Sequence, residues 1–90
     1  MQKIVRRTRG FEKAFVKLDK KIQEKFIQKL EIFLENENDR TLRNHRLKGS
    51  RKNEFSFSIT GDFRAIYEKE KDNAVIIFTF IDIGKHSQVY

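Results

Sequence analysis

Apolar positions in the first half of the chain follow the spacing of amphipathic helices. Residues 2–7 contain two β-branched residues, Ile4 and Val5, which predict a short strand. Thr8 can cap a following helix, whose apolar face consists of Phe11, Ala14, Phe15 and Leu18. Asp19 offers a second cap before a longer apolar stripe at Ile22, Phe26, Leu30, Phe33 and Leu34. The short join between these helices predicts a helical hairpin.

The second half of the chain changes to the two-residue alternation of strands. In "EFSFSIT", Phe55, Phe57 and Ile59 fall on one face and the two serines on the other. "TGD" at residues 60–62 predicts a tight turn into a strand over residues 63–70, and "EKDN" at residues 70–73 predicts a second turn. The next run, "AVIIFTFIDI", is apolar on both sides, which is typical of a strand inside a sheet.

This order of elements predicts a single α+β domain over residues 1–90. We expect the N-terminal strand and the helical hairpin to pack on one face of a small, mainly antiparallel four-stranded sheet. The opposite face is then free for function. His86 follows the last predicted strand, and Gly84 lets the backbone bend before it. We therefore expect the segment to be held by the sheet, with no C-terminal helix over the site.

Charge points to polyanionic partners. The chain carries 20 Lys and Arg residues against 13 Asp and Glu residues, a formal net charge of +7, which favours nucleic acid, an anionic membrane surface or an acidic protein segment. No cysteine is present, so disulfides and thiolate metal sites are excluded and a reducing, cytoplasmic location is expected. No apolar stretch is long enough to cross a bilayer. We expect neither a membrane nor a small-molecule cofactor.

Cationic side chains gather between residues 40 and 52, where no acidic residue occurs. A block of this density either solvates a loop or binds phosphates. If it binds RNA, the candidate contacts are Arg43, Arg46, Lys48, Arg51 and Lys52, together with Lys85 after the last strand.

The chain has two histidines, His45 within the basic block and His86 near the end. Each alone is more often an incidental residue than a catalyst. Together with an arginine and a tyrosine they meet the requirements of metal-free phosphodiester cleavage, because one imidazole takes a proton while the other gives one. An arginine stabilises the charge that develops at phosphorus. A zinc site, a P-loop, a nucleophile elbow and a dinucleotide fingerprint are all absent from the sequence.

Three segments together resemble a known family. "NHRLKGS" at residues 44–50, "FSITGDFRAIYE" at residues 57–68 and "FIDIGKHSQVY" at residues 80–90 are similar, in order and spacing, to the signatures of the RelE/YafQ superfamily of bacterial toxins from toxin–antitoxin pairs. The resemblance implies a metal-free endoribonuclease that cuts messenger RNA in the ribosomal A site and inhibits translation. Attack by the ribose 2′-hydroxyl would leave a 2′,3′-cyclic phosphate and a 5′-hydroxyl. It also implies an acidic antitoxin as partner.

The resemblance assigns catalytic roles to five residues. His86 matches the family's histidine after the last strand and is expected to be the general acid. His45 and Asp62 match a histidine and an aspartate that serve as base or orienter. Arg64 matches an arginine that contacts the phosphate, and Tyr90 matches a terminal aromatic residue that positions a nucleotide.

The sequence departs from the family where YafQ-like toxins carry a further histidine and this chain has Ser58. RelE itself has lysines where this chain has Phe55 and Phe57. Two other functions therefore stay open at the level of sequence. One is a non-catalytic inhibitor like the ParE branch of the superfamily, which acts on DNA gyrase. The other is a basic RNA- or ribosome-binding module without chemistry.

Overall fold

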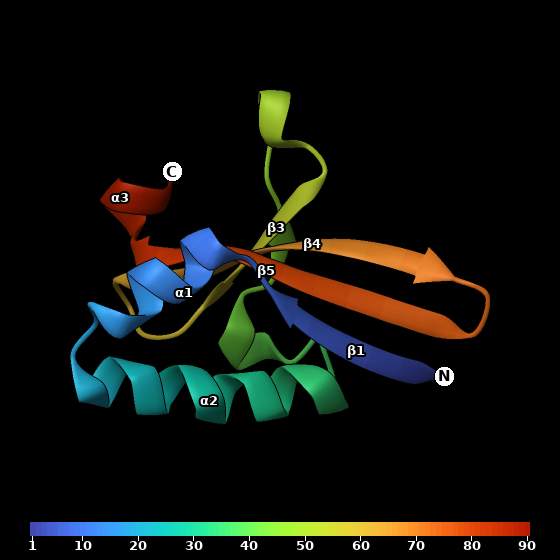
Figure 1. Cartoon of the computed structure of the whole chain (residues 1–90), viewed down its shortest axis with the longest axis horizontal. Coiled ribbons are helices and arrows are strands. Elements are labelled where there is room, and N and C mark those ends of the chain that lie inside the picture. The colour runs from blue at the N-terminus through green and yellow to red at the C-terminus, as the bar shows by residue number, and fades with distance from the viewer.

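The computed structural model describes residues 1–90 as a mixed sheet with a helical hairpin on one face (Figure 1). The strands are β1 (Gln2–Arg7), β2 (His45–Arg46), β3 (Glu54–Ser58), β4 (Phe63–Asp72) and β5 (Val75–Lys85). The helices are α1 (Arg9–Val16), α2 (Lys20–Glu35) and α3 (His86–Val89), with single 3-10 turns at η1 (Arg40–Leu42) and η2 (Gly49–Arg51). None of the helices combines the length and apolar character that crossing a bilayer requires.

The sheet has five strands in the order β1-β5-β4-β3-β2. β1 runs parallel to β5, and the other neighbours are antiparallel. The predicted α+β class is confirmed, but the predicted count of four strands was wrong. The additional strand, β2, lies inside the basic block and pairs His45 with Ser56. Two residues are too few to show a strand's alternation, so nothing in the sequence pattern marks it.

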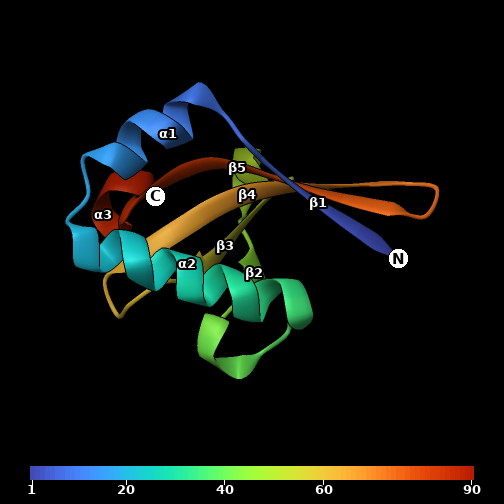
Figure 2. The same ribbon diagram turned by 60° about the horizontal axis from the view of Figure 1, so that its bottom comes forward.

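The β4–β5 hairpin is longer than predicted. β4 continues to Asp72, which pairs with Val75, so the turn consists of residues 73–74 and the turn predicted at residues 70–73 was misplaced. The charged residues 68–72 remain extended because each has a partner on β5. Figure 2 shows this hairpin, with β1 alongside, projecting well beyond β3.

The helical hairpin begins and packs as predicted. The Thr8 hydroxyl accepts a hydrogen bond from the Phe11 amide at 3.1 Å, and the Asp19 carboxylate accepts one from the Lys21 amide. Between the hairpin and the sheet lies a core of aromatic rings. The Phe33 ring is completely buried, with its centroid 4.7 Å from that of Phe78. Seven of the thirteen buried hydrophobic residues are aromatic, so aromatic rings dominate the core.

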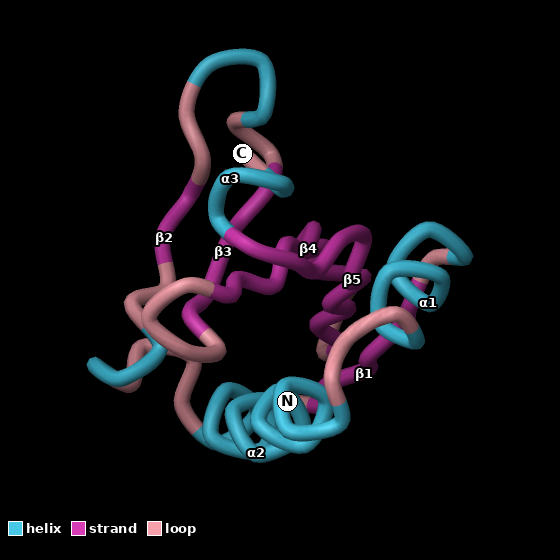
Figure 3. The backbone as a smooth tube through the Cα atoms, turned by 90° about the vertical axis from the view of Figure 1, so that its left-hand side faces the viewer, coloured by secondary structure: helices cyan, strands magenta, loops and turns pink.

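The opposite face of the sheet is covered at one end by α3. Figure 3 shows α3 and the C-terminus on one side of the sheet and α2 on the other. The expectation of no C-terminal helix was therefore wrong, because residues 86–89 form one turn. A Cβ atom on Gly84 would lie 3.0 Å from the Gln88 side chain and 3.3 Å from that of Val89. Gly84 thus permits the close approach of α3, which the sequence alone did not reveal.

Candidate functional site

The candidate site lies on the face of the sheet opposite the helical hairpin. Ser58 of β3 pairs with Arg64 of β4, which in turn pairs with Gly84 of β5. The preceding residue of β3, Phe57, is buried and stacks on Phe26 of α2. Because successive side chains of a strand point to opposite faces, this row faces away from the helices. His45 pairs with Ser56 and shares that face.

Tyr90 brings the two histidines together. Its ring centroid lies 4.2 Å from that of His86 and 6.4 Å from that of His45, and both imidazoles meet it edge-on. The Tyr90 hydroxyl donates a hydrogen bond to the Ser56 hydroxyl. His45 from the middle of the chain and His86 from near its end therefore lie beside the same aromatic ring, that of Tyr90.

The hydrogen bonding of His45 selects its tautomer. Its Nδ1 atom lies 3.0 Å from the backbone carbonyl oxygen of Arg43. A carbonyl only accepts hydrogen bonds, so Nδ1 must carry the proton. In the neutral ring Nε2 is then the acceptor, the state that a general base requires. The imidazole is exposed, so a ligand can reach it.

Asp62 contacts the site through its backbone. Its carbonyl oxygen accepts a hydrogen bond from the His86 amide at 2.9 Å, which ties the turn between β3 and β4 to the first residue of α3. The Asp62 carboxylate is exposed and forms no hydrogen bond or ion pair. The structure therefore brings Asp62 next to the backbone of His86 but does not join its carboxylate to either imidazole.

Arg64 is held at the edge of the same face. Its guanidinium donates to the carbonyl oxygens of Thr60 at 3.1 Å and Phe63 at 3.4 Å, and no carboxylate pairs with it. Its charge is therefore available to an anionic ligand. Opposite it, the Ser58 hydroxyl is buried without a hydrogen-bond partner.

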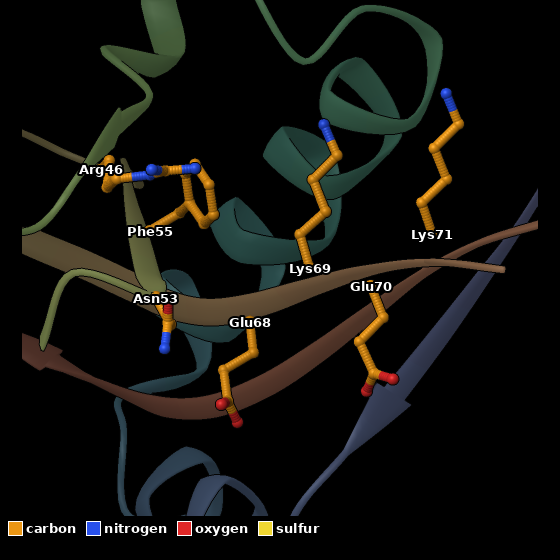
Figure 4. A pocket seen from close by; sticks show the side chains of 7 residues that line it. All are labelled: Arg46, Asn53, Phe55, Glu68, Lys69, Glu70 and Lys71. Carbon is orange, nitrogen blue, oxygen red and sulfur yellow. The ribbon is translucent and has the colours of Figure 1, made fainter.

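The predicted RNA contacts fall into three groups. Arg43, Lys48, Lys52 and Lys85 are exposed and form no ion pair. Arg46 lies with its guanidinium 5.1 Å from the centroid of the Phe55 ring and borders a shallow pocket beside β4 that none of the predicted catalytic residues lines (Figure 4). Arg51, the third group, forms its contacts with other residues of the protein.

The Arg51 guanidinium fastens α3 to the sheet. Its Nε and Nη2 atoms each lie 2.7 Å from Oε1 of Glu54, and Nη1 donates to the backbone carbonyl of Val89. The positions of His86 in α3 and of Tyr90 directly after α3 therefore depend on a side chain that the sequence predicted as an RNA contact. An arginine in the basic block could either contact RNA or attach α3 to the sheet. The sequence pattern is the same in both cases, so only the structure distinguishes them.

Sequence reasoning also missed Ser56 and the Asn44–Tyr67 pair. The alternation of β3 predicted that Ser56 faces away from the core, but not that it binds Tyr90. The buried Tyr67 hydroxyl donates to Asn44 Oδ1 at 2.8 Å, and burial raises the pKa of Tyr67 well above its ordinary value. This pair fixes the chain just before His45. No group of three or more His, Cys, Asp or Glu side chains is placed to hold a metal ion.

Comparisons with known proteins agree on a class of small toxins. The fold is similar to a YafQ structure from E. coli strain BL21(DE3), with a TM-score of 0.75, 20% identity and 99% of both chains covered. It is also similar to a YoeB/ParE toxin from Agrobacterium tumefaciens, with a TM-score of 0.74, 17% identity, and 96% of this chain and 99% of that chain covered. The comparison with curated proteins gave no match.

A third similar structure is an archaeal RelE–RelB complex from Pyrococcus horikoshii OT3, with a TM-score of 0.71 and 18% identity over 99% of this chain and 100% of that one. The family model described as the ParE toxin of type II toxin–antitoxin systems matches residues 5–90. The chain belongs to this family, and the predicted membership of the RelE/ParE superfamily is confirmed. It is a type II toxin with a RelE-like fold.

Proposed function

We propose that this toxin is a ribosome-dependent endoribonuclease that cuts messenger RNA in the ribosomal A site. The observation that carries the proposal is the meeting of His45 and His86 at the Tyr90 ring, with His45 in the tautomer of a base. Two imidazoles beside one open surface provide both halves of general acid–base catalysis. The unpaired guanidinium of Arg64 lies on the same face.

The reaction needs no group from outside the protein and the RNA. Nε2 of His45 removes the proton of a ribose 2′-hydroxyl, whose oxygen attacks the adjacent phosphorus. His86, protonated, gives its proton to the departing 5′ oxygen, while Arg64 stabilises the charge on the phosphoryl oxygens. The products are a 2′,3′-cyclic phosphate and a 5′-hydroxyl. Tyr90 positions a nucleotide against the two imidazoles, and Asp62 orients His86 through its carbonyl.

The proposal includes an acidic antitoxin as partner and action in the cytoplasm. The net charge of +7 favours an acidic partner, and the RelE–RelB structure is itself a complex. Arg43, Lys48, Lys52 and Lys85 would contact RNA phosphates when the partner is absent.

Primer extension on a reporter messenger RNA in a translating extract tests the proposal. The unaltered chain should cut within ribosome-occupied codons and leave 5′-hydroxyl ends. His86→Ala and His45→Ala should each lower the cleavage rate by roughly 10²- to 10⁴-fold, the usual contribution of a positioned acid or base. Lys21→Ala, in the exposed first turn of α2, serves as the matched control and should cut normally.

Cutting by both histidine variants at the rate of the control would refute the nuclease. Unbroken message with translation still inhibited would instead support a binding module without chemistry. The accompanying measurement in both cases is the 5′ end of each fragment, because a 5′-phosphate would exclude attack by the 2′-hydroxyl.

A second candidate function is inhibition of DNA gyrase. The observation that favours it is the matching family model, which is described by the ParE toxin. Purified chain would then block supercoiling of relaxed plasmid by gyrase, and His86→Ala would inhibit as well as the unaltered chain. Supercoiling at the normal rate in the presence of excess toxin would exclude this function.

A further inference from the structure

A second cationic pocket lies at the edge of the sheet, beyond the end of β2. It has a volume of about 280 Å³ and is formed where α2, η1 and the end of β3 meet. Lys25 and Lys29 come from α2, Arg43 from the residue after η1, and Ser58 and Thr60 from the end of β3. Of its lining residues, one is hydrophobic. The pocket thus suits a small charged group rather than an apolar side chain.

The cations of this pocket lack anionic partners within the protein. Lys25, Lys29 and Arg43 form no ion pair. The nearby acid is Asp39, whose carboxylate accepts hydrogen bonds from the Thr41 amide at 2.9 Å and the Thr41 hydroxyl at 2.6 Å. These bonds, and to a smaller extent Lys29, lower the pKa of Asp39. Its carboxylate is thus engaged with η1, and the three positive charges are left without a bound carboxylate.

Two residues that line the pocket also contact residues of the candidate site. Arg43 has a left-handed backbone, with φ of 49°, and its carbonyl oxygen receives the His45 hydrogen bond. Ser58 lines the pocket and pairs with Arg64 across the strands. A left-handed arginine is uncommon and is often found at functional sites. Here the same residue lines the pocket and contacts Nδ1 of His45 through its carbonyl oxygen.

We propose that this pocket binds a phosphodiester group of the RNA, next to the one that is cut. The proposal rests on the proposed nuclease function and extends its binding surface across the edge of β3. Lysine and arginine bind phosphate without regard to base sequence, and such contacts set the register of a strand. The pocket would therefore fix the position of the RNA relative to His45 rather than select a codon.

Binding of a hexanucleotide with 2′-O-methyl riboses tests this site, because the modified RNA binds but has no hydroxyl to attack. Its Kd would be measured by fluorescence anisotropy over a range of salt concentrations. Lys25→Ala/Lys29→Ala should weaken binding roughly tenfold and lower the slope of log K against log salt by about 0.7 to 1. The matched control is Lys20→Ala/Lys21→Ala in the first turn of α2, which lines no pocket and should leave both values unchanged.

An affinity and slope equal to those of the control would overturn the proposal, as would the absence of binding by the unaltered chain at low salt. The proposal would also be overturned if Lys25→Ala/Lys29→Ala weakened binding of a Glu-rich peptide of the same charge as much as it weakens binding of the RNA. The pocket would then be a general anion site. Failure of cleavage in the translating extract does not affect this readout. If the Lys25→Ala/Lys29→Ala variant lowers the salt slope but the unaltered chain does not cleave messenger RNA, the phosphate site is supported and the nuclease is refuted. If the unaltered chain cleaves but the variant keeps the full slope, the nuclease is supported and the phosphate site is refuted.

Discussion

Tyr90 contacts residues that are far apart in the chain. Its ring lies against His86 on its own helical turn and near His45 on β2, and its hydroxyl binds Ser56 on β3. Tyr90 as a whole residue is still 42% exposed. One face of the site is thus an aromatic surface that a nucleotide base can stack on, a contact worth about 1–3 kcal/mol per base.

Two substitutions distinguish the contribution of the Tyr90 ring from that of its hydroxyl. Tyr90→Ala removes the surface that aligns both imidazoles, and a misplacement of about 1 Å can cost roughly 10²-fold in rate. Tyr90→Phe keeps the ring and loses the bond to Ser56, so we expect a loss below about tenfold, in line with a single hydrogen bond. Single-turnover cleavage on programmed ribosomes measures both. Equal losses in the two variants would show that the hydroxyl takes part in the chemistry.

Tyr67 predicts a dependence of stability on pH. Burial raises its pKa, so the folded state favours the neutral phenol. In the unfolded chain a tyrosine ionises near pH 10. The contribution of Tyr67 to the free energy of unfolding is therefore fully present below about pH 10 and is lost as the pH rises further. Urea unfolding at about pH 7 and pH 10.5 should show a steeper loss for the unaltered chain than for Tyr67→Phe. Parallel curves would mean that Tyr67 is not protected in the fold.

At the scale of elements, α3 is a single turn with no stability of its own. Isolated helices of this length do not form in water, so contacts to the rest of the protein must hold it. The Asp62 carbonyl accepts a hydrogen bond from the first residue of α3, and the Arg51 guanidinium donates one to the carbonyl of Val89. The helical turn also packs closely against Gly84. The position of His86 therefore depends on three separate parts of the chain.

Arg51→Ala tests whether this arginine positions α3 or contacts RNA. Loss of the bond to Val89 should lower the single-turnover cleavage rate by roughly 10²-fold and leave the Kd for the 2′-O-methyl hexanucleotide nearly unchanged. An RNA contact would instead lower the affinity and the salt slope. Arg51→Lys should restore part of the rate, because a lysine reaches one of the two partners but cannot bind both in the manner of a guanidinium.

Gly84→Val should displace α3 while the core stays intact. A branched side chain overlaps Gln88 and Val89, and overpacking of this kind costs about 1–3 kcal/mol. We expect shifted NMR signals for residues 86–90, unchanged signals for α2, and lost cleavage. The control is Gly10→Ala in α1, because a Cβ at Gly10 would have its nearest neighbour at 3.7 Å, an ordinary van der Waals contact. Normal cleavage by Gly84→Val would show that α3 is not needed.

The elements that the sequence predicted are those that bury a periodic face. Helices α1 and α2 and strands β3 and β5 follow from the spacing of aromatic and β-branched residues, because each of these elements turns a regularly spaced apolar face to the core. β2 and α3 could not be predicted, since their stability comes from pairing with Ser56 and packing on Gly84 rather than from their own residues. The sequence predicted His45, His86 and Tyr90 as members of one site, and the structure places them together, while the contacts of Ser56 and Arg51 are visible only in three dimensions.

At the scale of the whole molecule, the excess positive charge is spread around the sheet edge and the helices and has few internal partners. The three ion pairs are Arg7–Glu12, Arg51–Glu54 and Lys69–Glu37. Most of the 20 cations therefore face solvent without a carboxylate. Such a field raises the rate of encounter with RNA or an acidic segment and weakens with salt.

An acidic antitoxin should therefore stabilise the fold, and less so in high salt. At a concentration 100 times its Kd, a ligand that binds only the folded chain adds about 2.7 kcal/mol to the free energy of unfolding. Urea unfolding with and without the antitoxin measures this gain at low and high salt, with a scrambled acidic peptide as control. An unchanged gain at about 1 M salt would show that apolar contacts, not charge, dominate the complex.

The parallel pairing of β1 with β5 also bears on synthesis of the protein. The first strand to leave the ribosome has its hydrogen-bonding partner in the last one, residues 2–7 with residues 75–80. β1 must therefore wait unpaired while the intervening elements are translated. His86 and Tyr90 are synthesised later still, so a partly made chain has neither the closed sheet nor the residues that the proposed mechanism uses as acid and nucleotide contact. Under that mechanism the nascent chain gains activity only after β5 has paired with β1 and α3 has packed on the sheet.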